Sequence, residues 1–199
     1  MGGSPGTSAL SFLLNTIIDL YVMLIALRYI MQIVRADYYN PIAQFIVKAT
    51  NPVLIPFRKI VPGWGKQDLA ALLFCWLALI AKLFLFKFIG LGVISIAGSG
   101  IVVSALGPAT IIALAAVDVL ALVFNIFFFA IIIMAVLSWV SPAGYNPIAA
   151  LVSSICEPLI APVRRYVPPL GGMDLSPLVA LIGLQVAKIL VIGMLMNLF

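Results

Sequence analysis

The chain has 199 residues, of which 65% are hydrophobic and only 9% charged, and its formal net charge is +5. Soluble domains contain about a quarter charged residues, so this composition excludes a soluble globular protein and indicates a membrane protein. The positive charge does not indicate nucleic-acid binding, because most Lys and Arg residues lie in two segments flanked by long apolar runs.

The sequence holds few of the residues that catalysis or metal binding uses. Histidine is absent, which removes the commonest metal ligand and general base. The two cysteines, Cys75 and Cys156, belong to no Cys-x-x-Cys motif, so we interpret them as packing residues. We therefore expect no catalytic residue, no metal and no cofactor.

An apolar run over 9–33 follows a tail of Gly, Ser and Pro residues. The run is about twice the length of the apolar part of a cleavable signal peptide, so it predicts a transmembrane helix of roughly 37 Å. Further apolar runs predict spans at 69–89, 110–140 and 175–199, with an outer turn at the glycines of 98–107. The predicted fold is an all-α membrane protein with four transmembrane helices.

The segment 39–82 occurs twice in the chain. A shift of 106 residues places 145–188 on it, and 16 of the 44 positions are then identical. Matching Pro, Gly and charged positions in one register indicate a duplicated unit, so we predict a first repeat over 1–100 and a second over 101–199. The recurring positions are Asn40, Pro41, Pro52, Pro56, Arg58, Pro62, Gly65 and Asp68, repeated as Asn146, Pro147, Pro158, Pro162, Arg164, Pro168, Gly171 and Asp174, with Lys59 matched by Arg165.

Charge predicts the orientation in the membrane. Lys and Arg concentrate in the loop 34–68 and its copy 141–174, whereas the tail, the central turn and the C-terminal end lack them. The positive-inside rule therefore predicts cytoplasmic loops and periplasmic termini. Because each repeat contains two spans, the two helical hairpins should share one orientation, related by a pseudo-twofold axis along the membrane normal.

Each loop begins with a helix signal. Asn40-Pro41 and Asn146-Pro147 place a capping residue before a proline at the first helical position. The apolar spacing that follows predicts an amphipathic helix of about ten residues, too short to cross the membrane. It either lies in the cytoplasmic interface or packs on the other repeat, and both alternatives stay open.

A proline-rich segment completes each loop. Pro56 removes a backbone donor and disfavours helix at Ile55. We therefore predict a kinked or interrupted element over 52–62 and 158–168, either re-entrant or flat on the membrane. The basic pairs that follow, Arg58-Lys59 and Arg164-Arg165, suit anionic lipid headgroups or serve only to set topology. We expect the next acidic residues, Asp68 and Asp174, to N-cap the second and fourth spans.

Polar residues inside the predicted spans are the second candidate site. Asp19 and Lys82 fall at similar depth, so we expect them to pair, and their equivalents, Asn125 and Lys188, should face each other. Near the outer end, Lys87 either pairs with Asp118 or snorkels, and we expect Arg28 to snorkel at the inner end. These pairs either fix which helix meets which or line an ion path.

The motif Tyr39-Asn-Pro-Ile-Ala, followed by Pro52-x3-Pro56-x-Arg58 and Gly65-x2-Asp68-Leu69 and repeated in the second half, resembles the YggT family of bacterial membrane proteins. The resemblance covers both halves and is to the two-repeat form. It implies the bacterial inner membrane. It also implies the family's links to cell division, to membrane-protein or cytochrome assembly and to osmotic tolerance, without assigned catalytic residues.

Our hypothesis is a non-enzymatic scaffold or assembly factor that acts through its two basic, proline-kinked loops. Its partners would be anionic lipid headgroups and other membrane proteins. The alternative is a small ion channel or transporter with a path past Lys82, Lys188, Asp19 and Asn125. An enzyme is the weakest interpretation.

Overall fold

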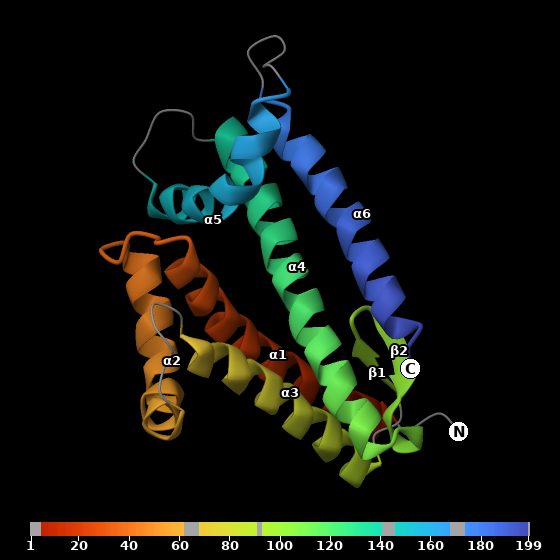
Figure 1. Cartoon of the computed structure of the whole chain (residues 1–199). Coiled ribbons are helices and arrows are strands. Elements are labelled where there is room, and N and C mark those ends of the chain that lie inside the picture. The colour runs from red at the N-terminus through yellow and green to blue at the C-terminus, as the bar shows by residue number, and fades with distance from the viewer. Residues whose placement is uncertain (1–4, 62–67, 91–92, 141–145, 168–173, 199) are drawn as a thin grey trace.

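The computed structural model describes residues 5–61, 68–90, 93–140, 146–167 and 174–198, and these are mostly helical (Figure 1). The elements in chain order are α1 (Pro5–Ile33), α2 (Pro41–Ile60), α3 (Leu69–Ile89), β1 (Val93–Ile96), β2 (Ser99–Val102), the 3-10 helix η1 (Val103–Ala105), α4 (Pro108–Val140), α5 (Pro147–Arg164) and α6 (Ser176–Met196). The helices α1, α3, α4 and α6 coincide with the four predicted spans to within a few residues.

Five of the described helices are long and apolar enough to cross a membrane, namely α1, α3, α4, α5 and α6. The protein is therefore a helical membrane protein, as its composition predicts. The helix α5 meets the criteria of length and composition in addition to the four helices at the expected spans. Figure 1 shows α5 beside the C-terminal end of α4.

The prediction of a helix of about ten residues is wrong, and of the two alternatives for the proline-rich segment, kinked or interrupted, the interruption is not present in its described part. The helix α2 runs unbroken for 20 residues through Pro52 and Pro56, and its copy α5 runs for 18 residues through Pro158 and Pro162. All four prolines lie on exposed positions. Meanwhile, buried residues continue at helical spacing along the opposite face. Packing of that face holds the helix where proline removes a backbone hydrogen bond, and Figure 1 shows α5 bending along its length.

The helix α2 packs on both halves of the protein. It contacts α1 and α3 of its own half and α5 of the other. The side chain of Asn40, which is buried, donates a hydrogen bond from Nδ2 to the backbone oxygen of Pro147 at 2.6 Å. Packing on the other repeat, one of the two alternatives left by the sequence, is thus present.

Arg28 does not snorkel as expected. Its side chain is buried, and Nη1 donates to the backbone oxygen of Val47, to Thr50 Oγ1 at 2.7 Å and to Asn51 Oδ1 at 2.8 Å. A guanidinium carries several donors in a fixed plane, so one Arg satisfies three acceptors on a neighbouring helix. Arg28 therefore fastens α2 to α1.

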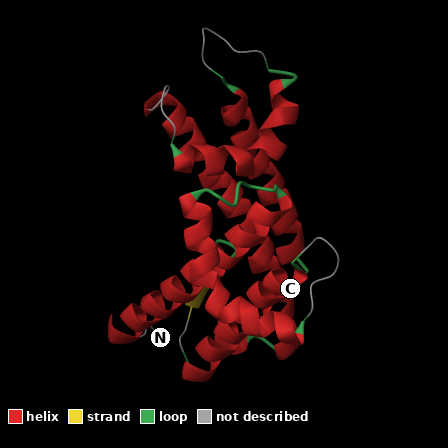
Figure 2. Cartoon of the chain, turned by 90° about the vertical axis from the view of Figure 1, so that its left-hand side faces the viewer, coloured by secondary structure: helices red, strands yellow, loops and turns green. Residues whose placement is uncertain are grey.

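A β-hairpin stands where the sequence predicted only a turn. Gly90, at φ 71°, ends α3 in the left-handed conformation, and β1 then pairs with β2 in antiparallel register. The turn consists of Ala97 and Gly98, both with positive φ, as two-residue hairpins require. Figure 2 shows this hairpin as a small strand element among helices. The expectation of a purely helical chain missed it.

Each half is built from three helices that contact one another: α1, α2 and α3 in the first, and α4, α5 and α6 in the second. The halves meet where α4 contacts both α1 and α3. One apolar core extends through both halves, from Val22 and Ile25 on α1 to Ile131 on α4 and Ile155 on α5. The junction between the halves is therefore part of the core, and polar side chains inside it need partners.

Candidate functional site

Lys82 is the centre of a polar cluster between the two halves. It lies on α3 with its side chain 1% exposed. Its Nζ is 2.6 Å from Asp19 Oδ1 on α1 and 3.7 Å from Asp118 Oδ2 on α4. The expected contact between Asp19 and Lys82 is thus present. An ammonium buried among apolar side chains is costly unless it is paired, and here each half contributes a carboxylate.

The second half repeats the pair with a neutral partner. Lys188 Nζ on α6 donates to Asn125 Oδ1 on α4 at 2.7 Å, as expected from the 106-residue shift. Within the described part of the chain, no carboxylate lies within ion-pair distance of Lys188. The two pairs have the same geometry but different electrostatics, because Asn125 cannot neutralise the lysine.

Of the two alternatives for Lys87, pairing with Asp118 or snorkelling, the pair with Asp118 is not formed. Lys87 donates instead to the backbone oxygen of Leu106. Asp118 Oδ1 accepts a hydrogen bond at 3.0 Å from the backbone nitrogen of Ala97, in the turn of the hairpin. The equivalent position in the first half is Phe12, so this carboxylate has no counterpart there. The hairpin, which the sequence did not predict, determines where Asp118 points.

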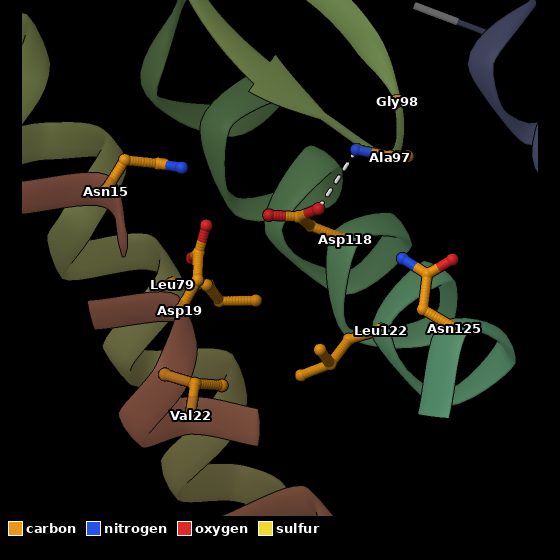
Figure 3. Close-up of a pocket in the computed structure, with 9 residues that line it drawn as sticks. All are labelled: Asn15, Asp19, Val22, Leu79, Ala97, Gly98, Asp118, Leu122 and Asn125. Atoms are coloured by element: carbon orange, nitrogen blue, oxygen red, sulfur yellow. Dashed lines mark hydrogen bonds between the residues drawn. The ribbon is translucent and has the colours of Figure 1, made fainter. Parts of the chain in front are cut away.

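A cavity of about 300 Å³ opens beside this cluster. Its polar lining comes from Asn15, Asp19, Asp118 and Asn125, and the hairpin turn at Ala97 and Gly98 closes one side. Figure 3 shows the carboxylates of Asp19 and Asp118 on facing sides of this space. The oxygen Asn15 Oδ1 is buried and has no hydrogen-bond partner within the described residues. Asn15 was missed, although it lies one helical turn before Asp19.

A larger, mostly apolar cavity of about 710 Å³ adjoins the polar one. Both are lined by Asn15, Asp19, Leu122 and Asn125, so the two cavities are adjacent. The apolar part follows α1 and α4 toward α2 and α5. We call it the inter-repeat groove.

The basic loop residues have internal partners. Arg58 Nε lies 3.3 Å from Asp68 Oδ1, and its Nη2 contacts the other oxygen. In the second half, Arg164 Nε lies 3.1 Å from Asp174 Oδ2. The same ion pair, ten residues apart, therefore forms in both repeats. These two arginines hold the loop to the next helix, which reduces their freedom to bind lipid headgroups.

Capping by the two aspartates is only partly as expected. Asp68 occupies the N-cap position of α3, but its side chain makes no capping hydrogen bond. Asp174 precedes the cap residue of α6 and accepts from the backbone nitrogen of Ser176 at 2.9 Å. Hydrogen bonds from Ser176 and the nearby charge of Arg164 lower the pKa of Asp174 below its ordinary value. It is therefore ionised and paired at neutral pH.

The remaining predicted residues divide into three groups. Asn40 and Asn146 accept hydrogen bonds at 2.9 Å from the backbone nitrogens of Ile42 and Ile148, ahead of Pro41 and Pro147, so both caps are confirmed. Lys59 and Arg165 are exposed. The third group, Pro62, Gly65, Pro168 and Gly171, lies outside the described residues.

The described residues contain no group of three or more His, Cys, Asp or Glu side chains placed to hold a metal ion. What the polar cluster does provide is charge. Two carboxylates and two ammonium groups lie in a largely apolar junction. Such an arrangement can fix the contact between helices, bind a charged or hydrogen-bonding group, or conduct ions.

The two lysines offer a matched test. Lys82→Met leaves two carboxylates without their ammonium and should lower the free energy of unfolding by about 3–5 kcal/mol. Lys188→Met leaves only a neutral amide and should cost about 1 kcal/mol. Adding Asp19→Asn should restore part of the loss in Lys82→Met. Denaturant unfolding in detergent measures all three, and equal losses for the two lysine variants would contradict the assigned charge pairing.

Comparison with known proteins gives one match in each repeat. The family model described as CCB3/YggT matches residues 7–89 and again 113–195. An uncharacterized protein of Pseudomonas aeruginosa is 42% identical over 190 residues, covering 94% of this chain and 89% of the relative. The uncharacterized protein YggT of Escherichia coli K12 is 36% identical over 181 residues, covering 90% and 87%.

A plant relative is similar over a shorter stretch. The chloroplastic YlmG homolog protein 2 of Arabidopsis thaliana is 38% identical over 64 residues, which is 31% of this chain and 24% of the relative. No solved structure matches the chain. The resemblance inferred from the duplicated Tyr-Asn-Pro-Ile-Ala motif is confirmed, and the chain belongs to the CCB3/YggT family of membrane proteins.

Proposed function

We propose that this protein is a non-enzymatic scaffold or assembly factor of the bacterial inner membrane. Its working surface would be the face formed by α2 and α5. The observation that carries the proposal is that both helices are fixed by the same set of polar contacts. Each has an asparagine cap and an arginine–aspartate pair to the following helix, and Asn40 joins α2 to α5 directly. Such a rigid, duplicated face suits the holding of a partner.

The exposed side chains on this face are those that bind at a membrane surface. Lys59 and Arg165 are exposed, and Tyr39 and Tyr166 are 88% and 86% exposed. Tyr is enriched where proteins meet the interface, and cations near the surface favour anionic lipid by about 1 kcal/mol each. Because Arg58 and Arg164 are already paired within the chain, we assign partner contact to Lys59 and Arg165.

The proposal includes an orientation in the membrane. The spans would be α1, α3, α4 and α6, arranged as two like-oriented hairpins, with α2 and α5 in the cytoplasmic interface and both termini periplasmic. The helix α5 has 18 residues, about 27 Å, which falls short of a hydrocarbon core of roughly 30 Å. Its copy α2 carries three basic residues and is not among the apolar candidates, and duplicated elements should be placed alike.

Cysteine labelling tests this orientation. In a background with Cys75 and Cys156 replaced by Ala, single cysteines would stand at Lys59, Arg165 and Ser99. A membrane-impermeant maleimide added to intact cells should label the Ser99→Cys variant only, because the hairpin faces the periplasm. Labelling of the other two without disrupting the cells would refute the orientation.

Photocrosslinking tests the scaffold role. A photoreactive amino acid at Lys59 or Arg165, in the full chain in native membranes, should capture the same membrane protein from both repeats. The matched control is Ile182, which is 56% exposed on α6. Capture of lipid alone at both loop positions, or equal capture from Ile182, would contradict the proposal.

A second candidate is a small ion channel or transporter, favoured by the cavity that Asn15, Asp19, Asp118 and Asn125 line between the halves. An ion path requires polar groups on facing helices, and these four residues supply them. Lys82 lies behind Asp19 and Asp118 and contacts both, so it sets the charge along such a path.

Ion flux decides between the two candidates. Proteoliposomes of the full chain should leak cations, and Lys82→Met should change the rate at least several-fold, if the second candidate holds. Lys87→Met, at a lysine outside the cavity, is the control. Proteoliposomes as tight as protein-free vesicles would remove the channel and leave the scaffold proposal untouched.

A further inference from the structure

We propose that the inter-repeat groove is a binding site for a membrane amphiphile that carries a protonated amine. The apolar body of the ligand would lie along the groove, and its ammonium would contact Asp19 at the polar end. This inference does not rest on the proposed scaffold role, since it uses a different part of the molecule.

The shape of the space supports an amphiphile. The groove and the polar cavity share four lining residues, and Asp19 is one of them, so a ligand in the groove lies next to this carboxylate. Their volumes, about 710 Å³ and 300 Å³, each fall in the range of about 300–1,000 Å³ typical of small-molecule sites. One end is lined by side chains such as Leu27, Ile126 and Ile155, and the other by carboxylates and amides. A molecule that fits must be apolar over most of its length and polar at one end.

The environment limits where the ligand comes from. The groove is lined by α1 and α4, which are long enough to cross the membrane, and by the N-terminal parts of α2 and α5. Several of its residues are exposed, for example Phe129 at 59% and Ile133 at 41%. In a bilayer those side chains contact lipid tails. The ligand is therefore a component of the bilayer, or dissolves in it.

The polar end presents acceptors. The side chain of Asp19 is 38% exposed, and one of its oxygens is bonded to Lys82. Asp118 faces it across the cavity (Figure 3). Carboxylate oxygens open to the cavity can accept charge-assisted hydrogen bonds, so a ligand donor at this place is favoured.

The charges at this end select a cation. Two carboxylates, Asp19 and Asp118, line the cavity, while Lys82 lies behind them with its side chain 1% exposed. Lys188 is held by Asn125 and is not among the lining residues, and Lys87 is bonded to Leu106. The charged side chains that line the cavity are both carboxylates, although the ammonium of Lys82 already contacts both of them from behind. An ammonium gains both charge neutralisation and hydrogen bonds there, an alcohol gains only a hydrogen bond, and an anion is repelled.

The experiment compares ligands that differ only at the head. The full chain, in nanodiscs of phosphatidylcholine, would be titrated with hexadecylamine, hexadecanol and hexadecanoate, with empty nanodiscs as the partition blank. We expect the amine to bind about tenfold or more tightly than the alcohol, since a charge-assisted hydrogen bond contributes about 1.5–3 kcal/mol. The carboxylate should bind more weakly than the alcohol. Equal binding of amine and alcohol would overturn the proposal.

Three variants locate the site. Asp19→Asn should abolish the preference for the amine while leaving alcohol binding intact, and Asp118→Asn serves the same purpose if the first variant does not fold. Ile133→Trp should weaken binding of both by filling the groove. The control Ile182→Trp, on the exposed face of α6, should change neither. An amine preference that survives both aspartate variants, or identical effects of the two tryptophans, would show bilayer partitioning only.

Discussion

The pairing of Lys82 with carboxylates from both halves is the constraint on which the arrangement of this protein depends. An ammonium cannot remain in an apolar junction without compensation, so α3 must lie where α1 and α4 both reach it. That requirement ties the first half to the second at the depth of Asp19 and Asp118. The inter-repeat groove and the polar cavity then follow, because the same helices line them.

Duplication explains the architecture, and divergence explains the candidate site. The two halves keep their asparagine caps, their arginine–aspartate pairs and the lysines at the equivalent positions 82 and 188, of which Lys82 is buried and Lys188 is half-buried. They differ in the charges inside the membrane: Asn125 occupies the position equivalent to Asp19, and Asp118 occupies the position equivalent to Phe12. The carboxylate of the second half therefore lies on α4 where it contacts Lys82 of the first half. The duplicated chain thus has one asymmetric, charged cavity, while the asparagine caps and arginine–aspartate pairs of α2 and α5 are the same in both halves. The two surfaces can therefore serve different partners.

Packing outweighed an expectation based on a single residue in two places, once for the backbone and once for a side chain. Proline was expected to kink or interrupt α2, yet the helix continues through Pro52 and Pro56, with buried residues at helical spacing as far as Leu54 between them. Arg28 was expected at the membrane surface, yet it is buried because three acceptors on α2 satisfy it. In each case, the gain from burying one face with its polar groups satisfied exceeds the local cost.

The sequence by itself determined the membrane setting, the duplicated unit, the four long helices and the pairs that the repeat spacing implies, including Asp19 with Lys82. These follow from composition, periodicity and identity at fixed spacing, which are properties of neighbouring or matched residues. Only the tertiary structure decided the hairpin, the partner of Asp118 and the role of Asn15. Those depend on which helices meet across the two halves, and a linear pattern holds no record of such contacts until the chain packs.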